Sequence, residues 1–85
     1  MARVARYGDA SDHGGMIIGG SPVSSADGRP IARVGDPHSY PIHGVTPMVS
    51  GSAIDWTDGR PTCRIGDAAA CGARIKTGSP TTWAD

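Results

Sequence analysis

The amino-acid sequence predicts an all-β fold built from short strands and tight turns. Three observations support this prediction. The chain of 85 residues contains no Leu, Glu or Gln, which are among the best helix formers, and no Phe or Asn either. Its 13 Gly and 7 Pro residues divide it into short apolar runs bounded by turn formers. Finally, one segment occurs three times, and each copy is too short to bury an apolar face by itself.

The length predicts a single domain spanning residues 1–85, with a core too small to be a secure source of stability. Small domains without helices are commonly stapled by disulfides, a metal ion or a partner chain. The two cysteines can form at most one disulfide, and no apolar run near the N-terminus is typical of a signal peptide. We therefore expect a protein made in the reducing cytoplasm, where a metal thiolate is favoured over a disulfide.

The charge of the chain argues against two classes of partner. Eight Lys and Arg residues balance eight acidic residues, so the net charge is zero. Nucleic-acid binding needs a basic surface that this composition does not supply. No apolar stretch approaches the length of a membrane span.

A short phrase returns three times, as ARYGD, ARVGD and CRIGD, and ends at Asp9, Asp36 and Asp67. It divides the chain into repeats at approximately residues 5–31, 32–62 and 63–85. Units of about thirty residues pack on one another because none buries its apolar face alone. We therefore expect a compact body in which the three repeats surround a shared axis.

Within the repeats, short apolar runs predict the strands, and the residues between them predict the turns. Residues 16–18 form the first such run and residues 31–34 the next. The pairs Asp27-Gly28 and Asp58-Gly59 are typical of type I′ hairpin turns, in which both central residues have a positive φ. Gly-Ser pairs mark a further turn in each repeat, at Ser21, Ser52 and Ser79.

Each repeat also carries a residue that can bind a metal and is followed by glycine: His13, His43 and Cys71. Equivalent residues converge near a shared axis, so we expect these three to face one central ion. His38 supplies the fourth ligand. Three imidazoles and one thiolate form the closed tetrahedral set of structural zinc sites, which leaves no position for a catalytic water.

Two alternatives to the zinc site stay open. A set of three nitrogens and one sulfur also suits iron or cobalt. The histidines could also be ordinary surface or turn residues, with Cys71 a small buried hydrophobe.

Several other residues allow two interpretations each. Cys63 stands where the other repeats have Ala5 and Ala32, which favours a role in filling the core. Each phrase places an arginine three residues before its aspartate, which favours Arg–Asp pairs that stabilise turns over a partner surface. Trp56 and Trp83 are expected to pack, although both follow a Gly-Ser turn and could belong to a docking face.

A hydrolytic site is the weaker alternative for the polar residues. His13 follows Asp9 and Asp12, which places an imidazole near carboxylates. The three serines of the Gly-Ser turns lack the nucleophile-elbow signature, so the sequence does not favour a Ser-His-Asp arrangement.

The phrases DGRPIARVGD and DGRPTCRIGD resemble the G-K-P-A-A-R-V-G-D phrase of the PAAR-repeat (proline-alanine-alanine-arginine) proteins. The segments GDASDHGG, GDPHSYPIHG and AACGARIKTGSP extend the likeness over essentially the whole chain. Ile31 and Thr62-Cys63 depart from the middle of the family phrase, and residues 52–55 depart from its S-P-T-V run. These departures lie in strands and turns rather than at the expected ligands.

The resemblance implies a small cone of short strands with pseudo-threefold repeats and a zinc ion near the tip. The ligands that it implies are His13, His38, His43 and Cys71. It also implies a non-enzymatic, membrane-piercing tip that caps the trimeric β-helical spike, the valine-glycine-repeat protein of the type VI secretion system.

By the same resemblance, effector proteins are further partners, and the target membrane is contacted only transiently. The tip is cytoplasmic before assembly and leaves the cell with the spike, and we expect no room for a toxin domain in this chain. The alternatives are the tip of a contractile phage tail or phage-like particle, and a small zinc-dependent hydrolase.

Overall fold

The computed structural model describes residues 2–41 and 44–84, apart from the side chain of His13. The described chain forms nine short strands and a three-residue 3₁₀ helix, η1 (Asp12–Gly14). The fold class predicted from the sequence, all-β, is therefore confirmed. No helix in the described residues has the length and apolar character needed to span a membrane.

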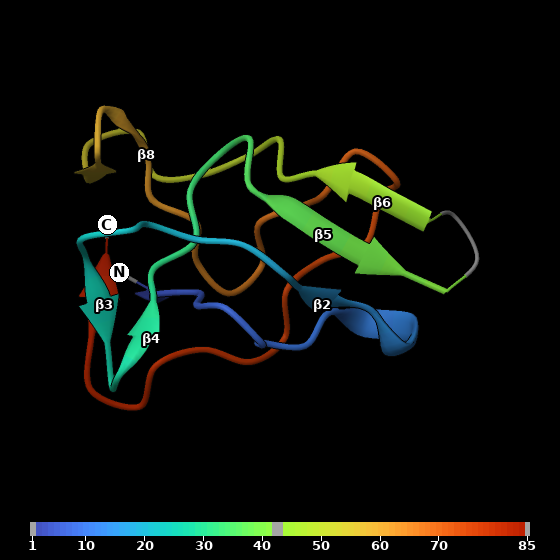
Figure 1. The fold of residues 1–85 in the computed structure, drawn as a ribbon, viewed down its shortest axis with the longest axis horizontal. Coiled ribbons are helices and arrows are strands. Elements are labelled where there is room, and N and C mark those ends of the chain that lie inside the picture. Colours follow the sequence, from blue (N-terminus) through green and yellow to red (C-terminus); the bar gives the residue numbers. More distant parts are fainter. Residues whose placement is uncertain (1, 42–43, 85) are drawn as a thin grey trace.

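Three pairs of antiparallel strands lie at one end of the molecule, together with both ends of the chain (Figure 1). They join β3 (Ser25–Ala26) to β4 (Arg29–Pro30), β7 (Trp56–Thr57) to β8 (Arg60–Pro61), and β1 (Ala2–Arg3) to β9 (Trp83–Ala84). We call this end the hairpin end.

The turns of the two continuous hairpins have the predicted backbone. The φ angles are 54° and 79° at Asp27 and Gly28, and 53° and 77° at Asp58 and Gly59. Both central residues of each turn thus lie in the left-handed region, as a type I′ turn requires. In the third pair the first and last strands of the chain pair without any turn between them.

A three-stranded antiparallel sheet occupies the other part of the molecule (Figure 1). Its central strand is β5 (Pro37–Tyr40), which pairs with β2 (Met16–Ile17) and with β6 (Gly44–Pro47). We call this the sheet end. The register sets His38 opposite Ile17 on one side and opposite Thr46 on the other.

Backbone hydrogen bonds join the three repeats in a closed ring. The N–H of Ala5 donates to the carbonyl of Cys63 at 2.9 Å, that of Cys63 to Ala32 at 3.0 Å, and that of Ala32 to Ala5 at 2.9 Å. A second closed set links the repeats nearer the sheet end, where Ile17 pairs with His38, Met48 with Ala69, and Ile75 with Ser11. Each repeat is therefore bonded to both of the others.

The buried core consists of sets of three equivalent residues, one from each repeat. Ala5, Ala32 and Cys63 form one set, and the larger Ile17, Met48 and Ile75 form another, all at most 2 % exposed. Cys63 thus fills the core, as predicted from its equivalence with the two alanines. Burial raises the pKa of its thiol to about 12, so the thiol stays protonated at neutral pH.

The two tryptophans, which we expected to pack, are both largely exposed. Trp56 is 59 % exposed and Trp83 is 50 % exposed. Successive side chains of a strand point to opposite faces, and in β9 the inward position belongs to Ala84 while Trp83 points outward. The ring of Trp83 lies under the guanidinium of Arg3, 5.2 Å from the ring centroid.

Candidate metal centre

Of the four expected ligands, the structure describes the side chains of two, His38 and Cys71. His38 is the second residue of β5 and is fully buried. Cys71 is partly buried, packs against the core, and is not in a disulfide. His13 lies in η1, but its side chain is outside the described part, and His43 lies outside the described residues altogether.

His38 presents a ring nitrogen that lacks a hydrogen-bond partner among the described residues. Its Nε2 lies 2.7 Å from the hydroxyl oxygen of Ser11, whereas its Nδ1 is buried and finds no partner within residues 2–41 and 44–84. The ring also stacks on Tyr40, with centroids 6.3 Å apart. A buried nitrogen with no partner is rare in a folded protein, and metal ligation is one explanation for it.

The environment of His38 favours the form of the ring that binds metals. Burial lowers its pKa, and the charge of Asp12 opposes this effect only in part. The imidazole is therefore neutral at neutral pH, as ligation requires.

The backbone agrees with the repeat alignment on which the ligand prediction depends. The glycines after the three aligned ligand residues all have a positive φ, of 86° at Gly14, 73° at Gly44 and 93° at Gly72. His38 instead follows its repeat's aspartate by two residues, as Ser11 and Ala69 do. The four expected ligands therefore come from two different repeat positions.

The described donors suit the expected ion. A buried imidazole nitrogen without a partner and a thiol in no disulfide are the donor types of structural zinc sites. Within residues 2–41 and 44–84, no three His, Cys, Asp or Glu side chains form a group that could hold a metal, and two of the four expected side chains fall outside that description. The identity of the metal stays a prediction.

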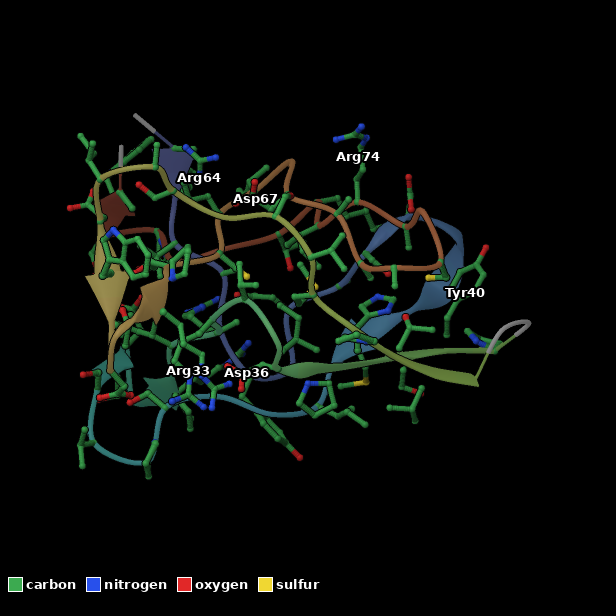
Figure 2. The ribbon with its side chains drawn as sticks, turned by 90° about the horizontal axis from the view of Figure 1, so that it is seen from above. Arg33, Asp36, Tyr40, Arg64, Asp67 and Arg74 are labelled. Atoms are coloured by element: carbon green, nitrogen blue, oxygen red, sulfur yellow. The ribbon has the colours of Figure 1, made fainter. Side chains whose placement is uncertain are left out.

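Each repeat also contains an ion pair between an arginine and the aspartate three residues later. Arg33 donates to the carboxylate of Asp36 from its backbone N–H, Nε and a terminal nitrogen, at 2.7, 3.0 and 2.8 Å. Figure 2 shows the two side chains beside each other. The same bonds recur between Arg6 and Asp9 and between Arg64 and Asp67. The prediction that these pairs stabilise turns is confirmed.

Two of these arginines also reach the hairpin turns. Arg6 donates to Asp27 at 3.2 Å, and Arg33 donates to Asp58 at 3.1 Å. The aspartate of each turn is therefore both a turn former and an ion-pair partner. Sequence reasoning predicted the turn but missed the ion pair, because the partners are more than twenty positions apart.

The serines of the Gly-Ser turns are structural. The hydroxyl of Ser21 accepts from the backbone N–H of Val23 and Ser24 and donates to the carboxylate of Asp58. Ser79 is placed in the same way, between the backbone of Thr82 and the carboxylate of Asp27. Both serines are at most 3 % exposed, so each hydroxyl closes a turn in the interior. The bonds to the aspartates join a Gly-Ser turn to a hairpin of another part of the chain.

The carboxylates near His13 are also engaged. Asp9 is 2 % exposed and binds Arg6, and Asp12 accepts the backbone N–H of Arg74 at 3.0 Å. Among the described residues no pocket is detected.

Large apolar side chains are exposed in and beside the hairpins. Val23 is 81 % exposed, Ile54 68 %, Trp56 59 % and Trp83 50 %. We call these four residues the apolar set of the hairpin end. Each of the four lies in, or within two residues of, a strand of this end, and exposed tryptophans are common anchors of interfaces.

Comparison with known families assigns most of the chain. Residues 7–77 match a protein family described as PAAR motif. The match covers residues 7–9 of the first phrase, the second and third phrases in full, the four expected metal ligands and both continuous hairpins. Comparison with the curated proteins finds no match.

Proposed function

This chain belongs to the PAAR-motif family, and from that premise we propose that it caps the trimeric β-helical spike of a type VI secretion system. Proteins of this family are spike-tip proteins of contractile injection systems. In the proposed role the chain is a non-enzymatic, membrane-piercing tip whose partner is the valine-glycine-repeat spike protein. It is made in the cytoplasm and leaves the cell on the spike.

The arrangement of the hairpin end supports the capping role. Three strand pairs lie at that end: one within the first repeat, one within the second, and one that joins residues 2–3 to residues 83–84 of the third. The backbones of Ala5, Ala32 and Cys63 bond to one another in a closed ring. We propose that the repeats are related by a pseudo-threefold axis through this ring. Such a face offers three similar contacts to three identical chains.

The exposed side chains supply the chemistry of the contact. A three-chain β-helix ends in strand edges whose backbone groups are unpaired, and a tip that covers them prevents association with other edges. The apolar set lies in and next to the short strands of the hairpin end, so docking there would bury apolar area beside the backbone contacts. We propose that the hairpin end is the docking face and that the sheet end points away from the spike.

A metal ion at the sheet end would serve the mechanical task of a tip. We propose that His13, His38, His43 and Cys71 hold one structural zinc ion there. The ion would cross-link loops of all three repeats, and structural zinc contributes on the order of 10 kcal/mol to folding. A cross-link resists splaying when the spike is driven forward, in a part of the chain that a small core cannot hold by itself.

Isothermal titration calorimetry with a purified cognate spike tests the docking proposal. We expect saturable binding of one chain per spike trimer, and a loss of affinity of at least tenfold for the variant Trp56→Ala with Trp83→Ala, because exposed aromatic residues are common anchors of interfaces. The control is Lys76→Ala, which changes an exposed side chain outside the apolar set. A spike that binds no wild-type chain would refute the capping role.

The metal proposal is tested by a matched pair of cysteine variants. Cys71→Ala should lose bound zinc and unfold at a lower temperature, because it removes the proposed thiolate ligand. Cys63→Ala should keep its zinc, since Cys63 is a protonated core residue and alanine occupies the same position in the other repeats. Metal analysis with thermal unfolding measures both. Equal zinc content in the two variants would contradict the proposal.

A further inference from the structure

We infer that Ser11 is the positioning residue of the proposed metal site: its hydroxyl engages Nε2 of His38, so that Nδ1 is the atom offered to the metal ion. The inference rests on the zinc site proposed above and deepens it, because it names the ligating atom and the residue that selects it. It concerns two residues whose side chains the structure describes.

Ser11 and His38 meet because the repeats place them at equivalent positions. Each follows its repeat's aspartate by two residues, as does Ala69, and the three are 0 %, 0 % and 2 % exposed. In this buried set one residue is the ligand, one is its hydrogen-bond partner, and the third is small enough to leave room for the ring. The same repeat position therefore has a different role in each of the three copies.

The hydrogen bonds assign a direction to the protons. The hydroxyl of Ser11 also lies 3.3 Å from the backbone carbonyl of Asp12, and a carbonyl can only accept. We assign the single hydroxyl proton to that carbonyl, since it is the one partner of Ser11 that must accept. The oxygen of Ser11 then accepts a hydrogen bond from the N–H at Nε2 of His38, which makes the neutral ring the Nε2–H tautomer and leaves a lone pair on Nδ1.

The opposite tautomer would leave a worse defect. If Nδ1 carried the proton, a buried N–H would lack an acceptor among the side chains and backbone that the structure describes, and unpaired buried donors are rarer in proteins than unpaired acceptors. With the lone pair on Nδ1, the unsatisfied group is an acceptor that a metal ion can complete. Residues that hydrogen-bond to the other ring nitrogen of a metal-bound histidine commonly fix its tautomer in this way.

The space around the pair is fitted to it. A methyl group at Gly15 would lie 2.5 Å from the hydroxyl oxygen of Ser11 and 2.8 Å from Cε1 of His38, the ring carbon between the two nitrogens. Both approaches are shorter than any ordinary contact, so only glycine at this position permits the Ser11–His38 contact. The backbone of Gly15 has φ −81°, so the requirement is one of space rather than of backbone conformation.

The tautomer is measurable without any metal. Long-range ¹H–¹⁵N correlation spectra of the ¹⁵N-labelled, metal-free wild-type chain should show His38 as the Nε2–H tautomer. After zinc is added, the Nδ1 resonance of His38 should shift while Nε2 keeps its proton. A metal-free ring protonated at Nδ1, or zinc bound through Nε2, would overturn the inference. These measurements use the wild-type chain alone, so they decide the matter even if a variant fails to fold.

The role of the hydroxyl is measured with Ser11→Ala and the matched control Ser79→Ala. Ser79 is also fully buried, but its hydroxyl binds Asp27 at the hairpin end. Ser11→Ala should mix the two tautomers and weaken zinc binding by about 10- to 100-fold, the usual effect of losing such a partner. Ser79→Ala should lower stability and leave the His38 spectrum and the zinc affinity unchanged.

The outcomes separate the inference from the site on which it rests. Ser11→Ala with the zinc affinity and His38 tautomer of the wild type would overturn the inference while the zinc site stands. A folded wild-type chain that takes up no zinc would refute the proposed metal site itself, and the positioning role with it.

Discussion

At the level of single residues, this protein buries charged side chains in ion pairs, and Arg33 and Asp36 are an example. The side chain of Arg33 is 10 % exposed and that of Asp36 is 5 % exposed, and hydrogen bonding to Asp36 raises the pKa of Arg33. The carboxylate also accepts the arginine's own backbone N–H, so one aspartate satisfies both the side chain and the turn. Because the apolar core is small, we expect buried ion pairs of this kind to contribute part of the stability of the fold.

Asp36→Asn should therefore destabilise the whole chain. The substitution leaves the guanidinium of Arg33 beside a neutral amide with Asp58 as its remaining ion-pair partner, so the loss should lie towards the lower end of the range of about 3 to 5 kcal/mol that breaking a buried ion pair typically costs. Urea unfolding of the wild type and the variant measures the loss. Lys76→Ala, at an exposed position, should change stability by no more than about 0.5 kcal/mol. A loss below about 1 kcal/mol for Asp36→Asn would show that the pair is not important for folding.

Asp27 makes stability depend on pH. Hydrogen bonds from Ser79 and Thr81, and the nearby charge of Arg6, lower the pKa of Asp27. A carboxyl group with a lowered folded-state pKa stabilises the fold above its ordinary pKa, and this contribution is lost as the pH falls through the lowered value. Asp27→Asn should flatten the acid limb of the stability curve, because the neutral amide does not titrate.

Urea titrations at intervals between about pH 2 and pH 6 measure that limb. Asparagine tolerates the positive φ of 54° at this position, so the turn is kept. An acid limb that is equally steep in both chains would contradict the assignment.

Among the elements, the loops that follow the Gly-Asp phrase show how one repeat can differ from the others. The backbone N–H of Ala10 donates to the hydroxyl of Thr77 at 2.9 Å, and that of Ala68 donates to Ser50 at 2.8 Å. At the third such contact the equivalent residues are Pro37 of the second repeat, which has no N–H, and Gly19 of the first repeat, which has no hydroxyl. A side chain at Gly19 would lie 2.6 Å from the proline ring. At this contact, a proline and a glycine that lie against each other stand where the other two contacts have a hydrogen bond from a backbone N–H to a side-chain hydroxyl.

This explanation predicts strong coupling between Gly19 and Pro37. Gly19→Ser alone should cost about 1 to 3 kcal/mol, because its Cβ meets the proline ring. With Pro37→Ala in the same chain, the hydroxyl introduced at position 19 can accept a hydrogen bond from the backbone N–H introduced at position 37. The Ala10–Thr77 and Ala68–Ser50 contacts have this form. The double variant should recover at least about 1 kcal/mol relative to the sum of the single variants. A double-mutant cycle by urea unfolding measures this, and additive losses would contradict it.

For the molecule as a whole, the decisive feature is that the chain ends complete the set of strand pairs. β1 and β9 pair as Ala2 with Ala84 and Arg3 with Trp83, and Val4 donates to the carbonyl of Thr82. The next residue, Ala5, belongs to the closed backbone ring. The pairing of the termini is therefore connected directly to the contacts that hold the three repeats together (Figure 1).

Removal of residues 83–85 should lower the stability of the entire chain rather than only loosen one end. The deletion leaves β1 unpaired, and we expect a loss of about 2 kcal/mol in one cooperative transition. Urea unfolding should be followed both by circular dichroism and by the fluorescence of Trp56, which lies in a different hairpin. Trp83→Ala is the control, since it keeps the backbone pairing of β9. An unchanged Trp56 transition in the truncated chain would contradict this connection.

Much of the local structure was predictable because it depends on neighbouring residues. The missing helix formers exclude helices, the Asp-Gly pairs set the turns at Asp27 and Asp58, and the spacing of three residues brings Arg33 onto Asp36. The repeated phrase also predicted that Cys63 lies inside. For the metal centre, the repeats identified candidate ligands but not which ring nitrogen of His38 is available.

The chain's residue types and their spacing determine its all-β character, its turns and the pairing of charges within each repeat, because these are contacts between near neighbours. Only the tertiary structure decided that Ser11 meets His38, 27 positions away, and that Trp56 and Trp83 point to solvent. Such contacts depend on how the three repeats stack on one another and on which positions face inward. That stacking is a property of the assembled backbone, and no short stretch of sequence encodes it.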